Sequence, residues 1–119
     1  MFQKFSHPML YVSDLSRAVE WYKQKLNFKE CFVVPNSYAS LHHEEMNFRL
    51  DLHPTEANSK DVGYGAIQYF LAKDFDQAME TLKNNGVKVG NPKREGTSPR
   101  FVTFWDSEGN ALGIEEARS

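Results

Sequence analysis

An internal repeat constrains the fold of this chain more than any other feature of its sequence. The segment 7–28, HPMLYVSDLSRAVEWYKQKLNF, aligns without a gap with 67–88, IQYFLAKDFDQAMETLKNNGVK. Asp14 falls on Asp74 and Lys23 on Lys83. Since two copies of one pattern indicate two copies of one structural unit, we expect two similar modules packed as one body.

Each copy predicts a strand, a tight turn and a helix. A short apolar run precedes Asp14 and Asp74, whose carboxylates can accept from the unpaired N–H groups of a first helical turn. The apolar residues that follow have the i, i+3, i+4, i+7 spacing of a helix with one buried face: Leu15, Ala18, Val19 and Tyr22 in one copy, Phe75, Ala78, Met79 and Leu82 in the other. We predict a helix over about 15–26 that ends at Asn27, and a second one that closes at Asn85-Gly86.

Three more strands are predicted after each helix, so each module should be βαβββ. The predicted strands are 5–12, 29–34, 38–42 and 48–53 in the first module, and 67–72, 87–90, 100–105 and 111–115 in the second. In the final hairpin turn, 106–110, Gly109 and Asn110 can accept positive φ. The fold class is α+β, and 1–119 forms a single domain of two modules, about 1–54 and 65–119, joined by a linker at 55–64.

Composition limits the partners and the location. The net charge is −2 and no basic face is evident, so we expect no nucleic-acid partner. The longest apolar runs are short strands, so we expect no membrane partner either. The single cysteine, Cys31, cannot form an intramolecular disulfide, which favours a cytoplasmic location; we expect Cys31 in the core or in a strand.

Two segments resemble the vicinal oxygen chelate superfamily, which contains glyoxalases, bleomycin-resistance proteins and extradiol dioxygenases. One is the opening HPMLYVSDL with the helix AVEWYKQKLNF, and the other is the closing FWDSEGNALGIEE, which is similar to the family's D-P-x-G-N hairpin. The resemblance covers nearly the whole chain. It implies paired βαβββ modules whose curved sheets enclose a cavity, in a homodimer that binds a small-molecule ligand.

The resemblance also implies where a metal would bind, because metal-using members take ligands from the first and last strands of each module. His7, seven residues before Asp14, matches the first position, and Asp51 or Arg49 matches the last strand of the first module. In the second module the matching positions are Ile67 and Gly113, which offer no ligand atom. The alternatives are Gln68, next to Ile67, and Glu115, which shares the face of Gly113 two residues further along the strand.

A divalent cation needs about three or four converging donors. Only His7 and Asp51 remain as candidate metal ligands on the matched positions. We therefore expect no cofactor, with a divalent metal as the alternative.

Strand alternation predicts a cavity lined by apolar and aromatic side chains around a small polar group. The candidate ligand-binding residues are His7, Met9, Tyr11, Arg49, Asp51, Tyr69, Trp105 and Gly113. Two interpretations of Arg49 are open: its guanidinium forms a bidentate fork for a ligand carboxylate or phosphate, or it pairs with Asp51. Gly113 is expected to leave room for a ligand.

Three functions fit these features. The first is a glyoxalase- or bleomycin-resistance-like protein that binds a small organic molecule without the usual catalytic metal. The alternative is a metal-dependent lyase, isomerase or dioxygenase with a remodelled site that includes His7 and Asp51. The third is an interaction module with a vestigial cavity.

Overall fold

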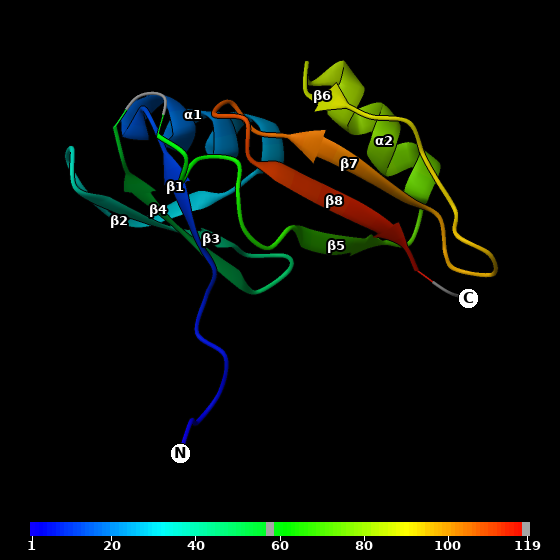
Figure 1. The fold of residues 1–119 in the computed structure, drawn as a ribbon, viewed down its shortest axis with the longest axis horizontal. Helices are drawn as coiled ribbons and strands as arrows, with labels where there is room; N and C mark the ends of the chain where they lie inside the picture. The colour runs from blue at the N-terminus through cyan, green and yellow to red at the C-terminus, as the bar shows by residue number, and fades with distance from the viewer. Residues whose placement is uncertain (57–58, 118–119) are drawn as a thin grey trace.

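A computed structural model describes residues 1–56 and 59–117 and contains two four-stranded sheets and two helices (Figure 1). The first module comprises β1 (Met9–Val12), α1 (Leu15–Leu26), β2 (Lys29–Val34), β3 (Tyr38–His43) and β4 (Phe48–Pro54). The second comprises β5 (Gln68–Ala72), α2 (Phe75–Asn84), β6 (Lys88–Val89), β7 (Phe101–Trp105) and β8 (Ala111–Glu116). The sheet orders, β1-β4-β3-β2 and β5-β8-β7-β6, are equivalent. The predicted α+β fold of two βαβββ modules is confirmed.

The helices begin and end as the repeat predicts. The Asp14 side chain accepts from the backbone N–H of Arg17, and the Asp74 side chain accepts from that of Gln77. Asn27 ends α1 in the left-handed conformation, with φ 62°. Local capping chemistry therefore fixes both strand-to-helix turns in the same way.

Strand pairing sets the two modules in register with each other. β1 runs parallel to β4 with Met9 opposite Asp51, and β5 runs parallel to β8 with Tyr69 opposite Gly113. Because Met9 and Tyr69 are equivalent in the repeat, Asp51 and Gly113 occupy the same position in their modules.

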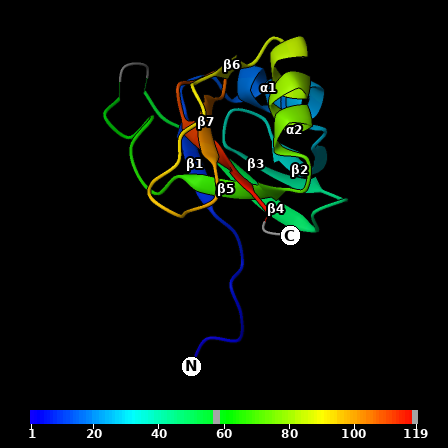
Figure 2. The same ribbon diagram turned by 90° about the vertical axis from the view of Figure 1, so that its right-hand side faces the viewer.

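The first strand is shorter than predicted. It begins at Met9 rather than at residue 5, because Pro8 has no N–H to add to the ladder. Pro8 contributes only its carbonyl oxygen, which accepts from the Asp51 N–H. Figures 1 and 2 show the helices on one side of the molecule and the N-terminal segment extending from the opposite side.

One hydrophobic core joins the modules. α1 packs on β3 and β4, and α2 packs on β6 and β8. The core residues come from both modules: Val12, Leu15, Ala18, Val19, Tyr22, Phe28, Ala39, Leu41, Leu50, Leu52, Phe75, Met79, Leu82, Val87, Val102, Phe104, Leu112 and Ile114. The apolar stripes of both helices thus face the core, with Ala78 at its edge.

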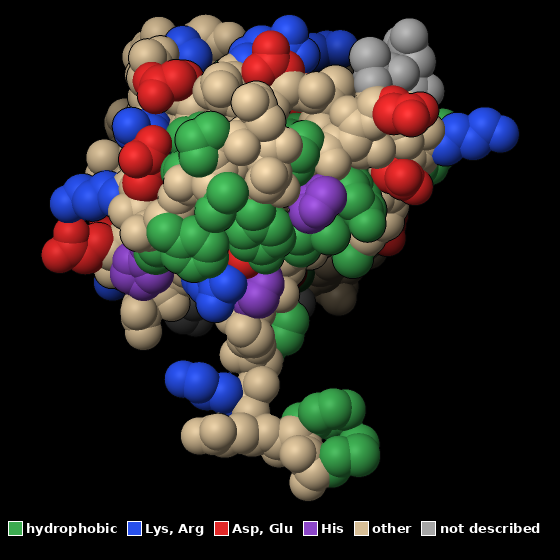
Figure 3. All heavy atoms as spheres, turned by 90° about the vertical axis from the view of Figure 1, so that its left-hand side faces the viewer, with side chains coloured by type: hydrophobic (Ala, Val, Ile, Leu, Met, Phe, Trp, Pro, Cys, Tyr) green, Lys and Arg blue, Asp and Glu red, His purple; other side chains and the backbone are tan. Residues whose placement is uncertain are grey.

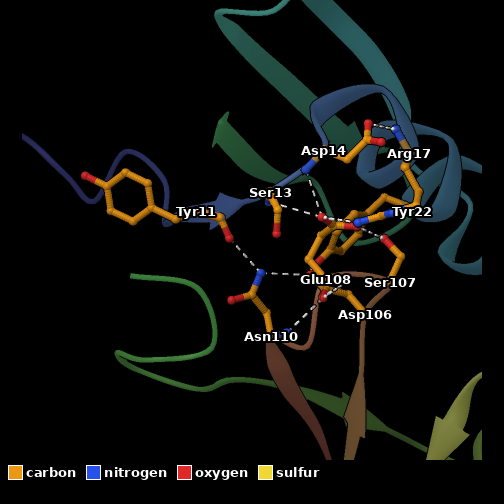
Figure 4. A network of polar contacts seen from close by, with 9 residues as sticks. All are labelled: Tyr11, Ser13, Asp14, Arg17, Tyr22, Asp106, Ser107, Glu108 and Asn110. Atoms are coloured by element: carbon orange, nitrogen blue, oxygen red, sulfur yellow. Dashed lines mark hydrogen bonds and ion pairs between the residues drawn. The ribbon is translucent and has the colours of Figure 1, made fainter. Parts of the chain in front are cut away.

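The turn between β7 and β8 fastens the second module to the first (Figure 4). The buried carboxylate of Glu108 accepts from the backbone N–H groups of Ser13 and Asp14, at 3.0 and 2.9 Å, and from Arg17 Nε at 2.7 Å. Burial opposes ionisation of Glu108, but these donors outweigh it and lower the pKa of its carboxyl group. The second module therefore supplies a charge at the start of the helix of the first module, where the helix dipole favours an anion.

Two further contacts complete this turn. The Tyr22 hydroxyl donates to Asp106 Oδ2 at 2.7 Å, and Asn110 Nδ2 donates to the Tyr11 carbonyl oxygen at 2.9 Å (Figure 4). Gly109 has the predicted positive φ, 90°, but Asn110 does not. The prediction of a positive φ at Asn110 was wrong. The buried side-chain amide of Asn110 instead connects the two modules through the Tyr11 carbonyl oxygen.

Cys31 lies in β2, as a strand residue, but its side chain is exposed and so it is not in the core. The linker boundary at 55–64 stays a prediction, and residues 57–58 of it lie outside the described residues. Within the described part of the chain, neither helix is long and apolar enough to span a bilayer.

Candidate functional site

A buried carboxylate on β4, that of Asp51, is contacted by three polar side chains of the first module. The side chain of Asp51 has no solvent exposure. Arg49 donates to it twice, from Nε to Oδ1 at 2.9 Å and from Nη2 to Oδ2 at 2.7 Å. The Tyr38 hydroxyl donates to Oδ2, and His7 Nε2 lies 3.1 Å from the same oxygen. Four donors from three side chains thus converge on Asp51, and we call these four residues the Asp51 cluster.

The cluster holds Asp51 in its ionised form. Burial alone would raise the pKa of the carboxyl group, but the hydrogen bonds from Arg49 and Tyr38 outweigh burial, so that the pKa lies below its ordinary value. Burial and the neighbouring Asp51 raise the pKa of Tyr38, whose hydroxyl therefore keeps its proton and remains a donor. The hydrogen bond to Asp51 raises the pKa of Arg49 in turn.

His7 is held from both of its ring nitrogens. Nε2 faces Asp51, and Nδ1 lies 2.7 Å from the Ser6 hydroxyl oxygen. In the tautomer that carries its proton on Nε2, the ring donates to Asp51 and accepts from Ser6 on Nδ1. In this tautomer neither nitrogen of the His7 ring has a lone pair free for another partner.

The structure brings part of the predicted ligand-binding set together. His7, Arg49 and Asp51 are in contact, and Met9 and Tyr11, each 37% exposed, lie beside them on β1. Of the two interpretations of Arg49, the structure shows the pair with Asp51. A ligand would meet the remaining N–H groups of Arg49, whose side chain is 38% exposed.

The other predicted residues lie on the second sheet. The Tyr69 ring covers Gly113 so closely that a Cβ on residue 113 would collide with it. Tyr69 also packs edge-on against Phe101, with ring centroids 6.4 Å apart. The room predicted beside Gly113 is therefore filled by an aromatic ring, and that prediction was wrong.

Trp105 lies at the far side of the same sheet. Lys88 Nζ sits 5.1 Å from the centre of its ring, at the distance of a cation–π contact. The ring also approaches Gly90. None of these contacts joins Trp105 to the Asp51 cluster.

The donor set of the first module does not fit a divalent cation. Of the two candidate ligands, His7 is bonded to Asp51, and every contact of Asp51 is with a hydrogen-bond donor. Within residues 1–56 and 59–117, no three His, Cys, Asp or Glu side chains gather closely enough to hold a metal ion. We therefore derive no chemistry from a metal at this site.

A hollow lies elsewhere, between the modules. It has a volume of about 480 Å³ and is open to solvent. It is lined mainly by apolar side chains from the end of α1, the turn after β3, β5 and α2, and by none of the predicted ligand-binding residues. We place the candidate site at the Asp51 cluster, because polar donors converge there on a face with exposed aromatic side chains. The hollow between the modules has no comparable set of polar side chains around one acceptor.

Tyr38 was not among the predicted site residues. It begins the predicted strand 38–42 and belongs to no motif, and only the pairing of β3 with β4 brings its hydroxyl to Asp51. The turn residues Asp106 and Glu108 were also missed, because their partners lie more than 80 positions away in the chain.

The family model described as Glyoxalase/Bleomycin resistance protein/Dioxygenase superfamily matches residues 4–114. This match covers nearly the whole chain and both modules. The chain belongs to that superfamily.

Solved structures agree with this assignment. A superfamily member from Sphaerobacter thermophilus DSM 20745 is 25% identical, with a TM-score of 0.79 over 97% of this chain and 98% of that one. TnmS3, an antibiotic binding protein from Streptomyces sp. CB03234, is 20% identical, with a TM-score of 0.79 over 99% of each chain.

A third similar structure is a mutant of the fosfomycin resistance protein FosX from Listeria monocytogenes, in complex with Mn(II) and 1S,2S-dihydroxypropylphosphonic acid. It is 17% identical, with a TM-score of 0.76 over 97% of this chain and 90% of that one. A comparison with curated proteins found no match.

Proposed function

We propose that this chain binds a small organic molecule on the exposed face of its first sheet, without a catalytic metal. The observation that carries this proposal is the saturation of Asp51 by donors from Arg49, Tyr38 and His7. A carboxylate in this state orders its neighbours. A ligand on this face would then contact Met9, Tyr11 and the remaining N–H groups of Arg49. The similarity to TnmS3, described as an antibiotic binding protein, supports a binding function.

We further propose that a second copy of the chain closes this face. Large apolar side chains are exposed on strands of both sheets: Met9, Tyr11, Phe32 and Val34 in the first module, and Tyr69 and Leu71 in the second. Such surfaces on a folded chain mark interaction sites. Figure 3 shows hydrophobic side chains gathered with His side chains on one side of the molecule. A homodimer would turn the open face into a cavity, and its mass is measured by light scattering after size exclusion.

The location of the protein in the cytoplasm is part of the same proposal. It is supported by the single cysteine of the chain, Cys31.

A matched pair of variants tests the site. We expect a compound found by thermal-shift screening of metabolites and antibiotics to stabilise the protein by about 2.7 kcal/mol at 100 times its Kd. Met9→Ser should weaken the binding of that compound. Met46→Ser should not, although Met46 is similarly exposed, 40% against 37% for Met9. Met46 lines the hollow between the modules. Weaker binding in Met46→Ser and unchanged binding in Met9→Ser would therefore place the site in that hollow.

The second candidate function is a metal-dependent lyase, isomerase or dioxygenase that uses His7 and Asp51. It is favoured by the Mn(II) in the FosX structure. In that case His7 and Asp51 would have to exchange their mutual contact for the metal. Near-stoichiometric metal in protein purified without chelator, lost in His7→Ala, would support this function over ours.

A further inference from the structure

Four rings cross the first sheet in a row, one from each strand. Tyr11 of β1 lies next to His53 of β4, with ring centroids 5.9 Å apart. His53 lies 5.9 Å from Tyr38 of β3, and Tyr38 lies 6.1 Å from Phe32 of β2. Because the sheet order is β1-β4-β3-β2, this aromatic row runs across the whole sheet. Its last step is diagonal, since Tyr38 stands opposite Val34 and Phe32 lies two residues from Val34 on β2.

The row is held by the sheet and is open to solvent. Tyr11 stands opposite His53 in the parallel pair, and the β3–β4 register continues the row to Tyr38. Phe32 is 50% exposed and Tyr11 37% exposed, and His53 is also exposed. Rings of this kind have apolar faces that flat π-systems can cover in stacked or edge-on contacts.

The row is joined to the Asp51 cluster through Tyr38. The Tyr38 hydroxyl and Arg49 Nη2 donate to the same oxygen, Asp51 Oδ2. The guanidinium therefore lies at the edge of the aromatic row. Arg49 gives Nε and one Nη2 hydrogen to Asp51, and since a guanidinium has five N–H donors, three remain for an acceptor on a ligand.

We infer that the ligand is a planar aromatic molecule of two or more fused rings, with an acceptor oxygen such as a carboxylate or carbonyl. This inference rests on the proposed function and names the class of its ligand. The fused rings lie along Tyr11, His53 and Tyr38, which are too far apart for one benzene ring to contact them all. The oxygen of the ligand accepts from Arg49.

Two probes of equal size separate planarity from simple apolar burial. The planar probe is 2-naphthoate, and its saturated, non-planar counterpart is decahydro-2-naphthoate. We expect isothermal titration calorimetry to give a Kd for 2-naphthoate about tenfold lower than for the saturated acid, as contacts with two aromatic side chains predict.

Ring-deleting variants place the contact. Tyr11→Leu and His53→Leu replace a ring of the row with apolar bulk and should each raise the Kd of 2-naphthoate by about 3- to 10-fold. Tyr64→Leu is the matched control, because Tyr64 is 79% exposed and lies outside the row. The Kd of 2-naphthoate for this variant should equal that for the unmodified chain.

Two results would overturn the inference: equal Kd values for the planar and saturated acids, or Kd values unchanged in both Tyr11→Leu and His53→Leu. Library compounds that are aliphatic and depend on Met9 would also overturn it, while leaving the proposed function in place. Failure of every library compound and both probes to bind would overturn both.

Discussion

Asp51 and Gly113 stand at the same position of two modules that share one backbone plan. In the first module this position holds a buried carboxylate to which Arg49, Tyr38 and His7 turn. In the second it holds a glycine, and the Tyr69 ring occupies the space beside it. Sheet order, the pairing of the first strand with the last, and the Asp N-cap of the helix are the same in both. The comparison teaches that the repeat determines the fold of each module, whereas its face is determined by a few side chains.

The largest expected effect comes from removing the carboxylate. Asp51→Ala should lower the free energy of unfolding by about 2–3 kcal/mol, since it leaves the donors that surround Asp51 without their charged acceptor. Urea denaturation measures this loss. A change below about 0.5 kcal/mol would mean that the Asp51 cluster does not organise the first sheet.

In the second module, the effect should depend on one neighbour. Gly113→Ala should cost about 1–2 kcal/mol, because the new Cβ forces the Tyr69 ring aside. In the double variant with Tyr69→Ala, the methyl group has room and most of the cost of Gly113→Ala should vanish. Additive losses in this double-mutant cycle would show that the ring and the glycine are independent.

Acid should distinguish the modules by a smaller effect. The pKa of Asp51 is lower in the folded chain than in the unfolded one, so its contribution to stability is present above the unfolded pKa of about 3.9 and disappears as the pH falls through the folded pKa. The unfolding free energy of Asp51→Asn, measured from pH 6 to pH 2, should therefore fall less steeply with acid than that of the unmodified chain. Gly113→Ala, which changes no titratable group, should keep the original slope.

Identical slopes for Asp51→Asn and the unmodified chain would contradict the pKa assignment. The comparison needs the difference between variants, because the carboxyl groups of Glu108 and Glu116 also have lowered pKa values and contribute to the acid response of both proteins.

The sequence predicts the fold well because its signals are local. The apolar spacing, the capping Asp14 and Asp74 and the closing Asn27 act over one or two helical turns, and all appear where they were predicted. The site was predicted only in part, because strand register decides it. The sequence could not choose between Arg49 and Asp51, and the structure shows that they form one unit.

The missed residues depend on contacts that cross the chain. Tyr38 reaches Asp51 only through the pairing of β3 with β4, and Glu108 reaches Ser13 over 95 positions. Gly113 misled for a related reason, since a missing side chain does not reveal which neighbour fills its space.

Calorimetry of the best library compound, with EDTA and then with Mn(II), tests the central claim most directly. Our account predicts stoichiometric binding in EDTA, a Kd unchanged by Mn(II), and weaker binding by Met9→Ser but not Met46→Ser. Binding that disappears in EDTA and returns with Mn(II) would contradict it, and would assign His7 and Asp51 to a metal.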